Sequence, residues 1–150
     1  LTSSAMVEMV DNIKNSPLGF GANCGTGASD LLRTVLGFAA QGTSVPIVAK
    51  GNAGIPKYVD GHIHYDGTPE LMGEYAILAR NCGARIIGGC CGTMPEHISA
   101  MRRALENNEK AQAPTLDVIS AALGPFSSSG DGTEENAPVA RQTRRRRRSS

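Results

Sequence analysis

The feature that most constrains this chain is a regular alternation of short apolar runs with longer amphipathic segments. Short apolar runs bounded by glycine or proline predict buried strands, and apolar residues three or four positions apart predict helices. We therefore expect strands at residues 18–24, 46–50 and 85–89. Helices are expected at residues 2–15, 29–41, 68–82 and 93–107, with a short helical candidate at 115–123. Residues 51–67 predict a long loop.

Several helix ends carry local signals. Ser29 is a predicted N-cap, Thr68-Pro69 starts a helix with proline at its first position, and residues 93–96 form a capping box. Gly83 is the expected glycine after the third helix. The side chains expected to face the core are Met6, Met9, Val10 and Ile13, then Leu32, Val35, Leu36 and Ala39, then Leu71, Tyr75, Leu78 and Cys82, and finally Ile98, Met101 and Leu105.

Strands separated by helices imply parallel strands joined by right-handed crossovers. The two α/β architectures to weigh are an open doubly wound sheet and a (β/α)8 TIM barrel. A barrel uses roughly 31 residues per β/α unit, so the ordered part supplies about three and a half units. With three parallel strands and four helices, half a barrel fits best. An aromatic content of only 4% also favours an α/β interior over a small β-sandwich.

The composition changes at the end of the chain. Residues 126–150 are rich in Ser, Gly, Glu and Arg and predict a disordered tail after a partial barrel at residues 1–125. Six arginines lie at residues 141–148, which leaves nine basic against fourteen acidic residues elsewhere. We therefore expect no specific nucleic-acid binding by the folded part. Without a long apolar stretch or an export signal, we expect no membrane span and a cytoplasmic protein.

Three of the four cysteines follow predicted strands. Cys24 ends the first strand, and Cys90 and Cys91 end the third. The carboxyl ends of parallel strands meet at one edge of the sheet, so these thiols are expected to converge there. Three thiolates with one open position make a catalytic type of zinc site. From spacing alone, three small core thiols are an equally good interpretation. Cys82 lies on an inward helix face and predicts a buried core thiol.

Three motifs resemble those of one enzyme family. They are Gly21–Cys24, Gly51–Pro56 and Gly88–Thr93. In order and approximate spacing they are similar to the homocysteine-binding barrel of zinc-dependent homocysteine S-methyltransferases. The longer strings at residues 25–32 and 62–70 look closest to the bacterial betaine–homocysteine methyltransferase branch. The resemblance covers residues 1 to about 125 and lacks the family's amino-terminal motifs, which implies the carboxyl-terminal half of the barrel.

The resemblance implies a site and a reaction. Cys24, Cys90 and Cys91 would bind Zn²⁺, and the sulfur of homocysteine would take the fourth position. The resulting thiolate would attack the methyl carbon of a small onium donor, giving methionine and, with betaine, dimethylglycine. Asn52 matches a position in the family's amino-acid-binding loop, although a simple turn residue is an equal alternative. Alternative functions are the homocysteine-binding domain of a cobalamin-dependent methionine synthase and a non-catalytic zinc-holding fragment.

Other features carry weaker signals. His62 and His64 alternate in the predicted loop and suggest an ordinary exposed pair, with a donor pocket, a subunit contact or a second metal as alternatives. His97 lies in the first turn of a helix and predicts a surface side chain. An open half-barrel would also expose an apolar flank, so we expect association, for example as a homo-oligomer.

Overall fold

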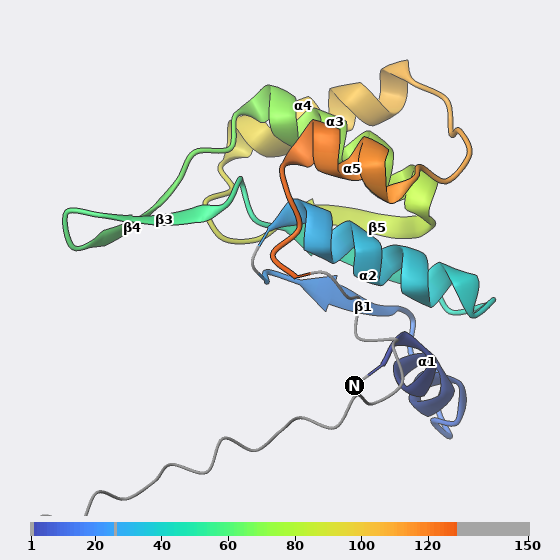
Figure 1. Cartoon of the computed structure of the whole chain (residues 1–150). Coiled ribbons are helices and arrows are strands. Elements are labelled where there is room, and N and C mark those ends of the chain that lie inside the picture. Colours follow the sequence, from blue (N-terminus) through green and yellow to red (C-terminus); the bar gives the residue numbers. More distant parts are fainter. Residues whose placement is uncertain (1, 26, 129–150) are drawn as a thin grey trace, which may run out of the picture.

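The computed structural model describes residues 2–25 and 27–128, which form an α/β structure (Figure 1). Its elements are α1 Ser3–Asp11, β1 Phe20–Asn23, α2 Ala28–Ala40, β2 Ile47–Gly51, β3 Pro56–Val59, β4 His62–Tyr65, α3 Pro69–Cys82, β5 Ala84–Gly89, α4 Pro95–Asn107 and α5 Leu116–Leu123. Each of the three strands and five helices expected from the sequence has a counterpart in this order. Across the described residues, no helix is long and apolar enough to span a membrane.

The main sheet contains β1, β2 and β5 as parallel strands, with β2 in the centre. Phe20 of β1 is opposite Ile47 of β2, and Gly51 of β2 is opposite Gly89 of β5. The prediction of three parallel strands is therefore confirmed. Because the strands run in the same direction, the residues that follow β1 and β5 come together beyond the end of β2.

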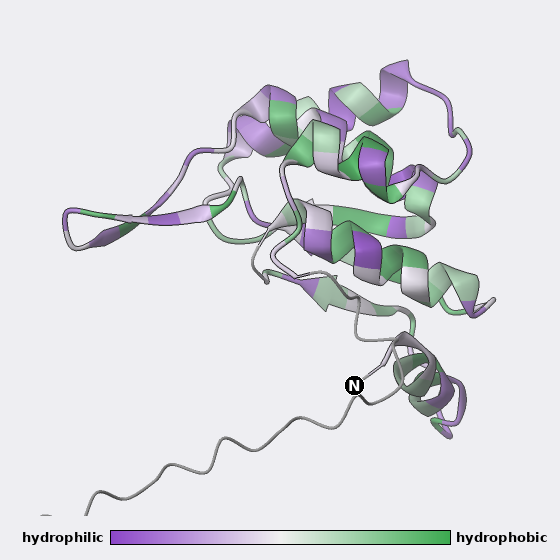
Figure 2. Ribbon diagram, in the orientation of Figure 1, coloured by the Kyte–Doolittle hydropathy of each residue, from purple (hydrophilic) through white to green (hydrophobic). Residues whose placement is uncertain are grey.

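The helices α2, α3, α4 and α5 gather on one side of the sheet (Figure 1), and hydrophobic and hydrophilic residues alternate along their ribbons (Figure 2). Leu32, Val35, Tyr75 and Ala49 are fully buried in this layer. The opposite face of the sheet is less covered, since Ile86 of β5 is 51% exposed where it pairs with Val48. The chain therefore buries one face of its sheet, as a segment of a barrel wall does.

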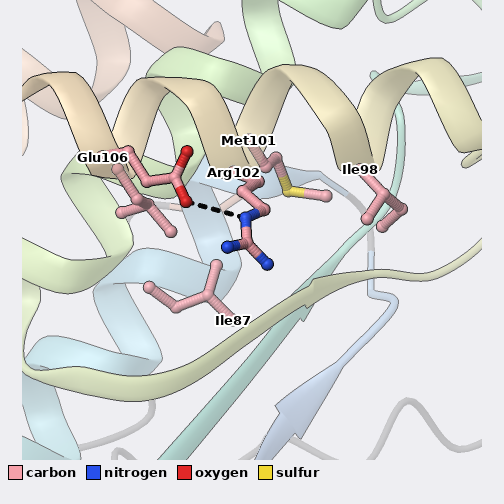
Figure 3. Close-up of a pocket in the computed structure, with 6 residues that line it drawn as sticks. Ile87, Ile98, Met101, Arg102 and Glu106 are labelled. Atoms are coloured by element: carbon pink, nitrogen blue, oxygen red, sulfur yellow. Dashed lines mark hydrogen bonds and ion pairs between the residues drawn. The ribbon is translucent and has the colours of Figure 1, made fainter.

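A second exposed apolar region lies between β5 and α4. Here the structure contains a cavity of about 320 Å³ lined by Ile87, Ile98, Met101, Leu105 and the Arg102–Glu106 ion pair (Figure 3). Ile98 was expected to face the core but is 47% exposed, whereas Met101 is buried as predicted. We call this region, together with Ile86, the β5–α4 flank. The helix carries the predicted apolar stripe, but about half of the surface of Ile98 remains exposed in the described residues.

Residues 56–65 form an antiparallel hairpin where the sequence analysis expected a long loop. Asp60 and Gly61 connect the two strands, and both have positive φ angles, 50° and 81°. Two residues of this type match the tight turn that joins antiparallel strands. The hairpin projects from the body of the molecule (Figure 1) and is largely exposed. The His-Ile-His-Tyr sequence of β4 does alternate polar and apolar residues, although both strands of the hairpin are largely exposed.

Two helix starts differ from their predictions. Gly27, not Ser29, is the N-cap of α2, and the buried Ser29 hydroxyl instead donates to the Gly124 carbonyl at 2.6 Å. In α4 the N-cap is Met94 rather than Thr93. The predicted caps of α3 are confirmed, because Thr68 accepts from the Leu71 N–H and Gly83 adopts a left-handed conformation.

The first helix is shorter than expected. It ends at Asp11, and its buried face contains Val7 and Val10, whereas Met9 and Ile13 are about half exposed. The buried face of α1 is therefore rotated by part of a turn from the face that the sequence predicted.

The segment after α5 contacts α2 at the start of the predicted tail. Phe126 packs partly against the core, and the Arg33 guanidinium lies 4.7 Å from its ring centroid. Arg33 also donates to the Ser128 carbonyl at 2.9 Å. Residues 126–128 thus contact α2, and the rest of the predicted tail, residues 129–150, lies outside the described residues.

Candidate metal centre

The three cysteines that follow β1 and β5 come together beyond the end of β2. Cys24 Sγ lies 2.7 Å from Cys90 Sγ and 3.5 Å from Cys91 Sγ, and the Cys90 and Cys91 sulfurs are 4.0 Å apart. Among residues 2–25 and 27–128, these cysteines are the one group of three or more side chains that could hold a metal ion. All three are free thiols.

The central strand positions both cysteine-bearing segments. The Cys24 N–H donates to the Lys50 carbonyl of β2 at 3.0 Å, and the Cys90 N–H donates to the Gly51 carbonyl at 2.7 Å. Just beyond β2, the Ala53 N–H donates to the Cys91 carbonyl at 2.9 Å. Each cysteine is therefore held by its backbone to the same short piece of chain, residues 50–53.

The backbone turns at each cysteine segment so that the sulfurs can converge. Cys24 has a φ of 59°, a left-handed conformation that is uncommon for a residue with a side chain. Such a conformation costs roughly 1 kcal/mol or more and is found mainly where the surrounding structure requires it. On the other side, β5 ends at Gly89, and the Thr93 N–H donates back to the Cys90 carbonyl at 3.2 Å. Cys90 and Cys91 therefore lie in a turn, where neighbours can point to the same side.

Asn52 links the two cysteine segments through its side chain. Its amide nitrogen donates to the Gly25 carbonyl, and its amide oxygen accepts from the Cys91 N–H, each at 3.2 Å. The side chain is only 2% exposed. The sequence analysis weighed substrate binding against a turn role, and the structure shows a third arrangement, a buried amide that bridges the segment after Cys24 to Cys91.

His97 is buried, so its predicted surface position is wrong. It is 7% exposed, and its Nδ1 accepts from the Met94 N–H at 2.9 Å. Nε2 therefore carries the ring hydrogen and donates to the Gly67 carbonyl at 2.8 Å. His97 thereby joins the start of α4, just after the cysteine turn, to the end of the hairpin. Sequence spacing alone could not reveal this role, because Gly67 is 30 positions away.

The remaining candidates lie apart from the cysteine cluster. Cys82 is a core thiol, as predicted, at 2% exposure, and burial raises its pKa to about 12. His62 and His64 are exposed on β4, and within the described residues neither belongs to a group of three metal-ligating side chains. A pocket of about 190 Å³ does adjoin the cluster, between Cys24 at the end of β1 and residues 30–34 of α2.

The thiols of the cluster shift one another's protonation. Hydrogen bonding from Cys90, and then from Cys91, raises the pKa of Cys24 to about 11. The same Cys24–Cys90 hydrogen bond, with a smaller contribution from Asn23, lowers the pKa of Cys90. Cys24 therefore keeps its proton at neutral pH, and Cys90 loses its proton more readily than an ordinary thiol does. A divalent metal that replaces the protons would satisfy all three sulfurs.

The donor set fits zinc. A tetrahedral ion with Zn–S bonds of about 2.3 Å places its sulfurs roughly 3.8 Å apart. The Cys24–Cys91 and Cys90–Cys91 separations, 3.5 and 4.0 Å, are close to that value, and the 2.7 Å Cys24–Cys90 separation would have to widen. Cys91 is exposed, so one side of the cluster remains accessible.

The sequence also matches a known protein family. The homocysteine S-methyltransferase family matches residues 2–105, a range that contains the main sheet, the hairpin and all three clustered cysteines. This match confirms the family that the motifs indicated. Because it covers more than half of the 150 residues, the chain belongs to the homocysteine S-methyltransferase family.

Proposed function

We propose that Cys24, Cys90 and Cys91 bind Zn²⁺ and that the protein transfers a methyl group from betaine to homocysteine. The observation that carries the proposal is the convergence of three cysteine sulfurs within 4.0 Å of one another in a chain of this family. The proposed enzyme acts in the cytoplasm. When bound, the metal would lower the pKa of a substrate thiol, so that a thiolate exists at neutral pH.

In the proposed reaction the substrate thiolate attacks a methyl carbon of the trimethylammonium group of betaine. A sulfur–carbon bond forms, the carbon–nitrogen bond breaks, and its electron pair stays on nitrogen. The products are methionine and dimethylglycine, and no external oxidant or reductant is needed. The accessible side of the cluster at Cys91 supports entry of a thiol substrate from solvent.

Asn52 is proposed to act on the cysteines rather than directly on the substrate. Its amide already bonds the Gly25 carbonyl and the Cys91 N–H, and little of it is exposed. It therefore fixes the separation of the two cysteine segments. Mutation of a residue that holds metal ligands in this way typically lowers metal affinity 10- to 100-fold.

We further propose that the chain is the carboxyl-terminal half of a (β/α)8 barrel. In the described residues both β1 and β5 have an unpaired edge, and the sheet is covered by helices on one side. The exposed Ile86 and the β5–α4 cavity support additional units packing there, either as further β/α units or as a second copy in a homo-oligomer.

The first test is the zinc content of the purified chain, compared with that of Cys24→Ala and Cys82→Ala. We expect about one zinc per chain in the parent and in Cys82→Ala, whose thiol lies in the core away from the cluster. Cys24→Ala should retain much less zinc. Equal zinc contents in all three proteins would contradict the assignment of the site.

The second test is methyl transfer with homocysteine and betaine in the absence of cobalamin. We expect methionine and dimethylglycine in equal amounts. Methyl transfer from methylcobalamin but not from betaine would instead assign the site to a methionine synthase type of domain. If zinc binds but added homocysteine neither releases a proton nor changes the metal's ligand set, the cluster is a non-catalytic zinc site.

A further inference from the structure

Tyr65 occupies a special place on the hairpin. It is the last residue of β4 and the one residue of that strand that is partly buried, whereas the preceding three are exposed. The tip of the hairpin projects away from the body, but its base lies near the cysteine turn (Figure 1). The sequence analysis did not single out Tyr65, because its position depends on the hairpin that was not predicted.

The Tyr65 ring packs against Gly92, the residue that follows Cys91. A Cβ at Gly92 would lie within 3.0 Å of the Tyr65 Cβ, Cγ and Cδ2 atoms. Gly92 also has a φ of 74°, in the left-handed region that favours glycine. The close approach of the tyrosine to the cysteine turn therefore requires a glycine at this position.

The Tyr65 hydroxyl interacts with the sulfur cluster. Hydrogen bonding to Cys91 is the largest of the effects that raise the pKa of Tyr65, and the nearby Cys24 and Cys90 contribute as well. A tyrosine hydroxyl has one O–H group that it can donate in a hydrogen bond. A thiolate sulfur is an acceptor for such a donor.

The base of the hairpin is fixed relative to the cysteine turn. Two residues beyond Tyr65, the Gly67 N–H donates to the Ala53 carbonyl at 2.9 Å, and the Gly67 carbonyl accepts from His97. Lys57 and Asp66 form an ion pair across the two strands. These contacts hold Tyr65 in place although the rest of the hairpin is exposed.

We propose that Tyr65 is a positioning residue of the cysteine cluster, whose hydroxyl donates a hydrogen bond to Cys91 Sγ while its ring covers the Gly92 side of that sulfur. Such a bond fixes the direction of the sulfur and withdraws part of its negative charge. This inference rests on the proposed metal site for its effect on metal binding, but the contact between Tyr65 and Cys91 does not depend on a metal.

The test compares Tyr65→Phe with Tyr58→Phe in the 150-residue chain. Both substitutions remove one hydroxyl, and the two tyrosines share a face of the hairpin, but Tyr58 is 77% exposed and far along it. Titration with Co²⁺ reports affinity and the sulfur-to-cobalt charge-transfer band. For Tyr65→Phe we expect about tenfold weaker binding and a band at longer wavelength, because Cys91 loses a hydrogen bond. Tyr58→Phe should match the parent. Parent-like affinity and spectrum in Tyr65→Phe would overturn the proposal.

A second measurement separates failure of this inference from failure of the proposed function. If the parent chain binds no Co²⁺, the metal site is contradicted, and Tyr65 is then judged on the metal-free protein. There we expect Tyr65→Phe to change the rate of Cys91 alkylation by iodoacetamide, relative to Cys90, by about threefold or more. Tyr58→Phe should leave that ratio unchanged. Equal ratios in Tyr65→Phe and the parent would overturn the proposal without reference to any metal.

Discussion

The carboxyl end of the sheet and the β5–α4 flank are built from opposite kinds of contact. At the carboxyl end, backbone N–H groups of Cys24, Cys90 and Ala53 each donate to a neighbouring carbonyl, and the Asn52 side chain bridges two segments. At the flank, Ile98 is 47% exposed beside a cavity of about 320 Å³, and Ile86, on the opposite face of β5 from the cavity residue Ile87, is 51% exposed. Directional bonds specify the first region, and unfilled apolar surface characterises the second.

The placement of the cysteines and the burial of the flank therefore depend on different contacts. The positions of the cysteines depend on hydrogen bonds that join residues 24–25 and 90–91 to residues 50–53. The flank has no such network, and its apolar side chains Ile86 and Ile98 are left about half exposed. The chain therefore combines a hydrogen-bonded site with a partly exposed apolar flank, and changes in one region should leave the other unaffected.

The largest effect is expected from Gly21→Ala, which tests the link between β1 and β2. A Cβ at Gly21 would lie within 2.7 Å of the backbone N, C and O atoms of Val48, so the two strands would have to separate. We expect a loss of about 3–5 kcal/mol in the free energy of unfolding, measured by urea denaturation. The control is Gly88→Ala, whose new Cβ would meet only Lys50 at 3.7 Å. Equal destabilisation by both substitutions would contradict this view of the sheet.

The pH dependence of metal binding tests whether the cysteine thiols are protonated before the metal binds. Hydrogen bonding holds the pKa of Cys24 at about 11 in the metal-free chain, so metal binding near neutral pH must displace at least its proton. Affinity should therefore rise at least tenfold per pH unit between about pH 6.5 and 8.5, and fall as the solution is acidified. Competition with a chelator of known protonation behaviour measures this slope. A flat profile would show that the cluster binds metal without losing a proton.

Substitution of Asn52 tests the bridge between the cysteine segments. Asn52→Ala leaves the Gly25 carbonyl and the Cys91 N–H without their partner. We expect at least tenfold weaker zinc binding and a loss of about 1–3 kcal/mol in stability. Asn81→Ala is the matched control, because its side chain accepts from the Ala111 N–H far from the cysteines. Zinc affinity should be unchanged in the control. An equal fall in both variants would show that Asn52 has no specific role in metal binding.

The smallest effect is expected at the flank. Ile98→Asp should lower the free energy of unfolding by about 1 kcal/mol, because only about half of this side chain is buried. Zinc affinity should not change. Self-association, measured by sedimentation velocity, should decrease relative to Leu18→Asp, a substitution of a residue that is 94% exposed elsewhere. If both variants associate like the parent, the flank is not a contact surface between copies.

Much of the fold could be predicted from the sequence where a pattern repeats locally. The caps at Thr68 and Gly83 depend on residues a few positions away, and both are confirmed. The convergence of Cys24 with Cys90 and Cys91 could also be anticipated, because parallel strands bring their carboxyl ends to one edge. That arrangement requires only the order of strands and helices.

The errors arise where a residue's partner is distant or absent. Ser29 looked like a cap, but its hydroxyl meets the Gly124 carbonyl, 95 positions away. His97 looked like a surface residue, but its ring is buried and bonds the Gly67 carbonyl, 30 positions away. Ile98 has the spacing of a core residue, and spacing reveals a face without revealing whether anything packs on it. Two local signals could have found the hairpin, namely the Asp60-Gly61 turn and the polar–apolar alternation of residues 62–65 that follows it.

Both cysteine segments are hydrogen-bonded to the end of β2, and this has a consequence for protein engineering. The geometry of the three sulfurs is encoded by one strand end, two backbone segments and one bridging amide, and not by closure of a complete barrel. These parts lie close together and could be transferred as a unit to another protein. A host protein with three parallel strands of matching register is therefore expected to accept the cysteine triad with its spacing preserved.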